Sequence, residues 1–297
     1  MTAEQRFARA RPRLVRLAYS ELGDLGEAED VVQEAWLRLE SARPETIADL
    51  DAWLTTVVGR LALDRLRSAR ARREAYVGPW LPEPLVSSGG EDPADRVTLD
   101  ESVSYALLAL LEQLSPAERT AFVLHDVFDV PFGEVAEVVG RTPEAVRQLA
   151  SRARRHVAER RPRFEASPDE HDRAVRAFAR AVGEGDLDGL VSVLDADVVW
   201  TSDGGGRAIA SRKPLHGAER VARGWVALRR RAIGPPTPIE LNGRLGLLIP
   251  GTDGNRSVLA FTVDGGRITR IDVVRNPEKL RRVGALPAKR PTPAAGA

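Results

Sequence analysis

The residues with the clearest chemical potential are two local clusters of arginine. Between residues 60 and 74 the chain has six Arg against two acidic residues, and between residues 143 and 163 it has seven Arg against two. Guanidinium groups bind phosphates and the edges of guanine bases. The whole chain carries 44 basic and 43 acidic residues, a net charge of +1, so the excess is local. Two such clusters favour a protein that contacts nucleic acid at two places, against the alternative of two solvated helix faces.

The second arginine cluster lies in a pattern of two short helices joined by a tight turn. Gly140 ends an amphipathic stretch, and a second helix follows with Thr142 as its N-cap and Pro143 at its first helical position. Apolar residues recur on one face of that second helix. A helix, a glycine turn and a basic helix are typical of a helix-turn-helix rather than an ordinary helical hairpin. The outward polar residues are Arg147, Gln148, Ser151, Arg152, Arg154 and Arg155.

Residues suited to catalysis or metal binding do not form a recognisable set. The chain has no cysteine, its four histidines are scattered, and no nucleophile, metal-ligand spacing or cofactor loop is visible. We therefore expect no enzyme activity, no metal and no cofactor. No apolar run approaches the roughly 20 residues that span a bilayer, so we expect a cytoplasmic protein without a membrane partner.

Composition and periodicity divide the chain into three folded segments. Residues 5–77 and 94–163 are predicted to be all-α domains, separated by a Pro-, Gly- and Ser-rich linker at 78–93. Helices followed by strands at 198–201, 239–241, 245–249, 257–263 and 268–274 predict an α+β domain over 169–284. The Pro- and Ala-rich residues 285–297 are expected to be a disordered tail.

An acidic helix supplies the first resemblance to a known family. Glu29, Asp30, Gln33 and Glu34 share one polar face, opposite an apolar face that includes Trp36. The stretch from 29 to 38, EDVVQEAWLR, resembles the helix of sigma-factor region 2 that docks on the β′ clamp of RNA polymerase. Taken alone, this acidic stretch is equally typical of a helix face exposed to solvent.

The two arginine clusters extend this resemblance. The sequence DAWL at 51–54, followed by Arg60, Arg65 and Arg67, resembles the part of region 2 that opens and reads the minus-10 promoter element. The loop at 41–50 is the better candidate for gripping an unstacked base, since the apolar stripe around Trp53 favours core packing.

The helix-turn-helix resembles region 4, which reads the minus-35 element. Its pattern places Arg147, Gln148, Ser151 and Arg152 in the groove, with Arg154, Arg155 and Thr142 at phosphates. Two such regions joined by a linker are the layout of the extracytoplasmic function (ECF) sigma factors. The resemblance implies RNA polymerase core, through the β′ clamp and β flap, and promoter DNA as partners.

Three short motifs resemble the signature of one ECF group, group forty-one, whose members carry a fused SnoaL-like domain. That domain is similar to the ketosteroid-isomerase cone, a curved sheet wrapped by helices, and it implies control in place of or beside an anti-sigma factor. Arg207 stands where the group usually has Lys. The motifs are Trp80, Leu81, Pro82, Glu83 and Pro84; Asp203, Gly204, Gly205, Gly206 and Arg207; and Asn276, Pro277, Glu278, Lys279 and Leu280.

From this resemblance we expect the DGGGR glycines to allow close approach to the sigma core near Trp80–Pro84, although a simple turn would also explain them. Residues 276–280 would pack back on the core. A cone pocket would include Trp200, Asp203, Trp225 and Asp272, and its partner would be a small ligand or a protein. The competing function is an operator-binding regulator with a small-ligand domain, which would need neither the acidic helix face nor the first arginine cluster.

Overall fold

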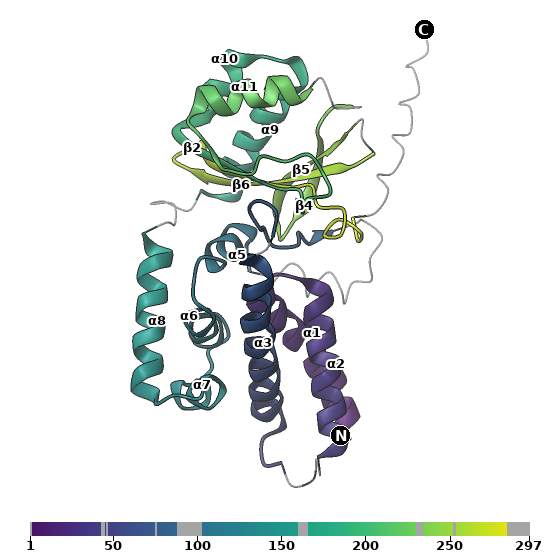
Figure 1. Ribbon diagram of the computed structural model, residues 1–297, viewed down its shortest axis with the longest axis vertical. Coiled ribbons are helices and arrows are strands. Elements are labelled where there is room, and N and C mark those ends of the chain that lie inside the picture. Colours follow the sequence, from purple (N-terminus) through teal and green to yellow (C-terminus); the bar gives the residue numbers. More distant parts are fainter. Residues whose placement is uncertain are drawn as a thin grey trace.

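The computed structural model describes residues 2–42, 45, 47–74, 76–87, 103–159, 166–229, 234–251 and 254–283. The last six residues of the predicted linker, 88–93, and the predicted tail, 285–297, lie outside these residues. Figure 1 shows an α+β domain seated on the ends of a group of helices. The predicted class, two helical domains followed by an α+β domain, is confirmed.

The first helical domain consists of α1 (Ala3–Leu22), α2 (Leu25–Ser41) and α3 (Leu50–Glu74). A capping box at Thr2 begins α1, and Gly23 ends it with a φ of 67°, a left-handed value that favours glycine. The Asp24 side chain then accepts a hydrogen bond from the Glu27 amide and begins α2. This tight connection sets α1 and α2 side by side against α3.

The second helical domain contains α5 (Tyr105–Leu111), α6 (Pro116–Phe122), a π-helical turn (Val123–Val127), α7 (Phe132–Val139) and α8 (Pro143–Ala158). Gly140 ends α7 with a φ of 71°, and Thr142 caps α8, as predicted. Val146, Leu149 and Ala150 face inward from α8 and are buried. The predicted helix-turn-helix is therefore confirmed as α7, its glycine turn and α8.

The two helical domains share one hydrophobic core. Helix α3 of the first packs against α6 and α7 of the second. The contact is close at Gly59, where an added Cβ would lie 3.2 Å from Cγ1 of Val138 and 3.4 Å from Cδ1 of Leu124. In this arrangement the two domains therefore touch directly.

The α+β domain is built on a seven-stranded sheet with the order β1-β4-β5-β6-β7-β2-β3. All neighbouring strands are antiparallel except β2 and β7, which are parallel. The predicted strands are confirmed with slightly wider bounds. They are β2 (Leu194–Asp203), β4 (Thr237–Leu241), β5 (Arg244–Pro250), β6 (Arg256–Asp264) and β7 (Arg267–Val274). The short strand β3 (Leu215–His216), which pairs with β2, was not predicted.

Helices α9 (Pro168–Glu184), α10 (Leu187–Val193) and α11 (Ala218–Arg229) cover one face of this sheet (Figure 1). Phe178 of α9 packs edge-on against Trp225 of α11 and Phe261 of β6, which places the domain core between helices and sheet. A smaller apolar cluster on the sheet includes Leu81 and Tyr105, which come from the sigma-like part of the chain.

The predicted linker is not a loose connection where the structure describes it. Residues Leu81 to Leu85 are buried, and Val86–Ser87 form β1, which pairs with Leu241 and Glu240 of β4. The proline-rich sequence suggested an exposed linker because its apolar residues do not recur at the spacing of a helix or a strand. Here the burial comes from tertiary contacts with a sheet more than 150 residues further along the chain.

Replacing Gly224 with Ala is expected to destabilise the α+β domain. A Cβ at Gly224 would lie 2.6 Å from Cζ3 of the buried Trp200 ring, so the helix or the ring must shift. Overpacking of this kind costs about 1–3 kcal/mol, which urea unfolding would measure. Gly183→Ala in α9 is the matched control, because its Cβ would meet nothing within 4 Å and alanine favours helix. Equal midpoints for both variants would contradict the expected clash.

Candidate nucleic-acid interface and interdomain site

The polar face of α8 is exposed to solvent. Its six predicted groove and phosphate residues, from Arg147 to Arg155, are all exposed. Thr142 Oγ1 accepts a hydrogen bond from the Ala145 amide at 3.3 Å, so this hydroxyl serves as the N-cap of the helix.

Several of these arginines have acidic partners within the second helical domain. Arg152 Nε lies 2.9 Å from Glu118 Oε1, and Arg154 Nε lies 2.6 Å from Asp126 Oδ1. The Arg152 guanidinium and the Ser115 cap hold the pKa of Glu118 below its usual value, although partial burial opposes them. Exposed pairs of this kind contribute little stability. The acidic partners hold the side chains near α8 without blocking its exposed face.

On the acidic face of α2, some residues are exposed and others form ion pairs with arginine side chains. Asp30 and Gln33 are exposed. Glu34 pairs with Arg38 of its own helix at 2.7 Å and with Arg65 of α3 at 3.8 Å. Glu29 pairs at 2.6 Å with Arg282, 253 residues further along the chain. The far end of the α+β domain therefore reaches the predicted polymerase-binding face.

The predicted DNA-binding arginines of α3 lie along one helix. Arg60 donates through Nε and Nη2 to the backbone oxygen of Glu137 in α7, at 3.3 and 3.1 Å. Arg67 pairs with Asp64 at 3.3 Å. Trp53 is half-buried against the helical core, as the sequence pattern favoured. In the predicted base-gripping loop, residues 43, 44 and 46 lie outside the described part.

The three short motifs, far apart in sequence, meet around Asp203. This carboxylate is fully buried at the end of β2. Its Oδ1 accepts a hydrogen bond from the Tyr76 hydroxyl at 2.6 Å, and its Oδ2 accepts from the Leu81 amide at 3.0 Å. Lys279 Nζ lies 2.7 Å from the same Oδ2 and completes a buried ion pair. We call Asp203, Lys279, Tyr76 and Leu81 the interdomain latch.

The Lys279 ammonium is also held by the segment between the two helical domains. It donates to the backbone oxygen of Leu81 and lies 3.7 Å from the centre of the Trp80 ring. A cation over an indole face gains electrostatic attraction, and more so when it is shielded from water. Because Lys279 is only 6% exposed, each of these contacts stabilises its charge more than the same contact would in water.

The glycines after Asp203 allow the turn that brings residue 276 close. Gly205 has a φ of 61°, and a Cβ there would lie 2.5 Å from Nδ2 of Asn276. A Cβ on Gly206 would lie 3.3 Å from Val77. The expected close approach is therefore to Asn276 and to Val77, just before Trp80. Arg207 is exposed and pairs with Glu278 at 2.8 Å.

The segment Trp80–Pro84 contacts all three domains. Leu81 bonds to Asp203, while the Pro82 oxygen accepts from the Tyr105 hydroxyl at 2.9 Å. Glu83 binds the connection between α1 and α2: its amide donates to the Gly23 oxygen at 2.8 Å, and its Oε2 accepts from the Leu25 amide at 2.7 Å. Burial raises the pKa of the Glu83 carboxyl.

Sequence reasoning missed several residues of this junction. Asn242, in the turn between β4 and β5, accepts from the Leu85 amide at 3.1 Å and donates to the Tyr19 hydroxyl at 3.2 Å. Burial raises the pKa of Tyr19 far above its usual value, so the phenol stays neutral. An Asn-Gly pair between two apolar runs is a hairpin signal and marks this turn in the sequence. No comparable signal marks Tyr76 or Arg282.

Comparison with known proteins decides the family. The model of sigma-70 region 2 matches residues 7–72, and a model of sigma-70 region 4 matches residues 104–157. The ECF RNA polymerase sigma factor SigJ of Mycobacterium tuberculosis is 43% identical over 92% of this chain and 92% of its own length. The chain belongs to the ECF family of RNA polymerase sigma factors.

Further relatives agree with this assignment. The probable ECF RNA polymerase sigma factor SigI of Mycobacterium tuberculosis is 39% identical over 90% of this chain and 91% of its own length. A crystal structure of Mycobacterium tuberculosis SigJ matches with a TM-score of 0.77 and 38% identity, covering 93% of this chain and 98% of that one. The similarity therefore includes the fused SnoaL-like domain, and the operator-binding alternative is not favoured.

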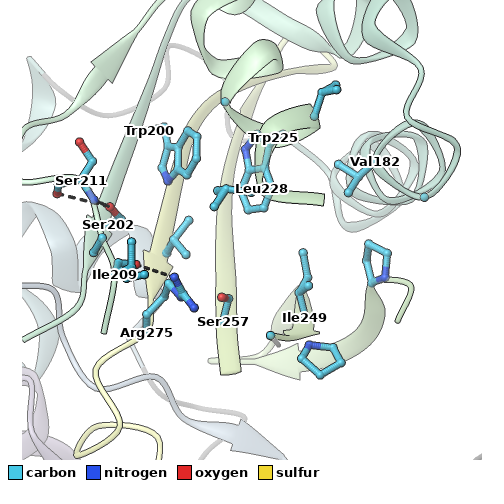
Figure 2. A pocket seen from close by; sticks show the side chains of 18 of the residues that line it. Val182, Trp200, Ser202, Ile209, Ser211, Trp225, Leu228, Ile249, Ser257 and Arg275 are labelled. Atoms are coloured by element: carbon cyan, nitrogen blue, oxygen red, sulfur yellow. Dashed lines mark hydrogen bonds between the residues drawn. The ribbon is translucent and has the colours of Figure 1, made fainter. Parts of the chain in front are cut away.

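Two of the four residues predicted to line a pocket of the sigma factor's SnoaL-like domain do so. Trp200 and Trp225 line a cavity between the helices and the sheet (Figure 2). Asp203 and Asp272 do not: Asp203 belongs to the latch, and Asp272, which is 2% exposed, pairs with Arg270 at 2.7 Å. Alternation along β2 and β7 explains this, since neighbouring residues of a strand point to opposite faces.

Among the described residues of this sigma factor, no group of three or more His, Asp or Glu side chains could hold a metal ion. Within the same residues, no helix has the length and apolar character needed to cross a bilayer.

Proposed function

We propose specific roles for the residues of this sigma factor and a control function for its fused domain. We assign residues 5–77 to region 2, 94–163 to region 4 and 169–284 to the SnoaL-like domain. Arg147, Gln148, Ser151 and Arg152 read the minus-35 element in the major groove, while Thr142, Arg154 and Arg155 hold phosphates. Their exposure on the polar face of α8 supports this assignment.

Region 2 would supply the remaining contacts. Arg60, Arg65 and Arg67 bind the DNA backbone near the minus-10 element, and Glu29, Asp30, Gln33 and Glu34 bind the β′ clamp of RNA polymerase. In the arrangement described here Arg60 is bonded to α7 and Glu29 to Arg282. Two of the proposed contact residues are thus engaged within the chain itself.

We infer that this arrangement is a closed state. Elements named for positions 35 and 10 are about 25 base pairs apart, which is about 85 Å of B-DNA at 3.4 Å per base pair. Regions that share a hydrophobic core and touch at Gly59 would have to separate to reach both elements at once. Separation exposes apolar surface, which opposes it unless polymerase and DNA bind the open form better.

The fused domain would hold this closed state. The observation that carries the proposal is that Trp80–Pro84, the segment between the two regions, is bonded to region 2, region 4 and the buried Asp203 together. The domain also covers Glu29 through Arg282. A domain bound in this way regulates access of polymerase to the sigma regions, in place of or beside a separate anti-sigma factor.

The assignment of α8 is tested by transcription with core RNA polymerase and the full chain on a library of random promoters. Gln148→Ala is expected to relax base preference at one or two minus-35 positions, because a bidentate amide–adenine contact contributes about 1–3 kcal/mol of discrimination. Arg155→Ala should weaken initiation at all promoters about equally and lower the salt dependence. Arg176→Ala, on α9 of the fused domain, is the control. Unchanged preference in Gln148→Ala would contradict the groove assignment.

A further inference from the structure

Four arginines of α1, none of which belongs to the two arginine clusters, form a row along one face of the helix. Arg6, Arg9, Arg13 and Arg16 are spaced by three, four and three residues, which places them one above another on a helix. We call these four residues the arginine row. The first three line a groove of about 520 Å³ between α1, the start of α3 and residues 128–134 of region 4.

The arginine row lies beside the part of region 2 that we assign to the minus-10 element. Arg13 Nη1 donates to the Thr55 hydroxyl of α3 at 3.0 Å. Asp51 and Ala52, one turn earlier in α3, line the same groove. Helix α3 begins at Leu50, directly after the loop predicted to grip an unstacked base. A DNA strand that leaves this loop across the start of α3 therefore reaches the arginine row next.

In the closed state, region 4 supplies the opposite wall of the groove. The guanidinium carbons of Arg13 and Arg16 lie over the Phe128 ring, 5.8 and 5.6 Å from its centre. The carboxylate-bearing residues Asp129 and Glu134 also line the groove. An aromatic ring accompanied by carboxylates presents the same kinds of group as an unstacked base with its phosphates. Residues 128–134 therefore occupy the arginine row much as a nucleotide would.

The charge of the groove depends on whether region 4 is in place. Region 2 contributes Arg6, Arg9, Arg13 and Asp51 to the lining, and region 4 contributes Asp129 and Glu134. Positive and negative charges are then equal in number, whereas withdrawal of region 4 leaves the arginines in excess. Within the described part of the chain, Arg6 and Arg9 form no ion pair. A polyanion therefore meets these two cations without displacing a charged partner.

We propose that the arginine row binds single-stranded promoter DNA beside the minus-10 element, and that residues 128–134 cover it in the closed state. Arg13 and Arg16 stack on an unstacked base in place of the Phe128 ring, because a planar guanidinium packs on aromatic faces. Arg6 and Arg9 hold the adjoining phosphates. The DNA contact needs only that region 2 meets promoter DNA, whereas the covering step rests on the proposed closed state.

The DNA contact is tested with holoenzyme, formed from core RNA polymerase and the full chain, on a fork-junction promoter whose non-template strand is single-stranded. Arg9→Gln is expected to weaken binding, measured by fluorescence anisotropy, about tenfold, the effect of losing one charge-assisted hydrogen bond. The slope of log affinity against log salt should fall by about 0.7, the value for one phosphate of a single strand.

Arg11→Gln is the matched control for the loss of one positive charge. Arg11 is exposed on α1 but does not line the groove, since it lies two residues from Arg9 and so on another face of the helix. It should keep the affinity and the salt dependence of the unmodified holoenzyme. Equal affinities for Arg9→Gln and Arg11→Gln would overturn the DNA contact.

The covering step is tested on the full chain without polymerase, with a single-stranded oligonucleotide of the same promoter. Glu134→Gln removes a carboxylate from the cover and should raise affinity about threefold. Adding Arg9→Gln should remove this gain, whereas adding Arg11→Gln should keep it. Glu184→Gln, exposed on α9, is the control for loss of a negative charge and should give no gain.

The two parts of the proposal fail separately. Unchanged affinity in Glu134→Gln, together with the expected loss in Arg9→Gln holoenzyme, would refute the covering and leave the DNA contact. Failure of the closed-state proposal itself would instead be seen in variants of the interdomain latch, which leave both walls of the groove unchanged.

Discussion

Lys279→Met is expected to open the latch and increase transcription by core RNA polymerase with this sigma factor. The substitution leaves the Asp203 carboxylate fully buried, held by the Tyr76 hydroxyl and the Leu81 and Gly205 amides, none of which carries a charge. Removing one partner of a buried ion pair costs about 3–5 kcal/mol. Separation of the domains lets water reach Asp203 and relieves most of that cost, so the open state becomes populated.

Two measurements check this result. Hydrogen exchange of the Leu81 amide should accelerate by about 100-fold or more, since 1.4 kcal/mol corresponds to a factor of ten. Multiple-round transcription at a limiting sigma concentration should increase. Lys213→Met is the matched control, because Lys213 is exposed at the surface of the same domain.

The double variant Asp203→Asn/Lys279→Met separates loss of the latch from loss of folding. Removing both charges leaves no buried carboxylate, and the amide oxygen still accepts from Leu81, so part of the protection should return. Slower exchange in the double variant than in Lys279→Met is the expected order. If Lys279→Met kept the exchange rate and transcription of the unmodified chain, the latch would not hold the closed state.

The elements that local patterns specify were predicted well. The capping residue Thr142 and the glycine at 140 place the helix-turn-helix, and apolar runs place four of the strands within two residues. These features depend on hydrogen bonds and periodicity within a few residues of sequence. The resemblance to one group of sigma factors then identified the three motifs that meet at the latch.

What the sequence did not predict depends on contacts between distant segments. No local signal indicates that the proline-rich residues 81–85 are buried, because burial there comes from β4, α1 and α5 together. The same holds for Arg282, whose partner Glu29 lies near the other end of the chain. Asp272 was expected in the pocket by residue type, whereas the side of the strand it occupies depends on register.

A second large effect is expected at Glu21, at the interface between regions 2 and 4. Glu21, on α1, is fully buried, and its Oε2 accepts from the Thr120 hydroxyl of α6 at 3.0 Å. Its Oε1 has no partner among the described residues. Burial raises the pKa of Glu21 to about 7, although Arg119 and Thr120 lower it in part.

The direction in which the stability of the closed form changes with pH follows from proton linkage. Because the closed form holds the Glu21 proton more tightly than an open or unfolded chain, its stability falls as the pH rises from about 4.5 to about 7. Above pH 7 the full cost of the buried carboxylate applies. Glu21→Gln removes that cost and should stabilise the closed form by about 3 kcal/mol at pH 8, and by almost nothing near pH 4.5.

Urea unfolding at pH 5 and pH 8 measures this difference, with Glu40→Gln on the exposed end of α2 as the control. Because the stabilised interface joins α1 to α6, Glu21→Gln should also reduce transcription at pH 8, opposite to Lys279→Met. Greater stability without reduced transcription would mean that regions 2 and 4 do not need to separate at this interface. A midpoint independent of pH in both proteins would show that Glu21 is not a buried carboxylate whose charge opposes closure.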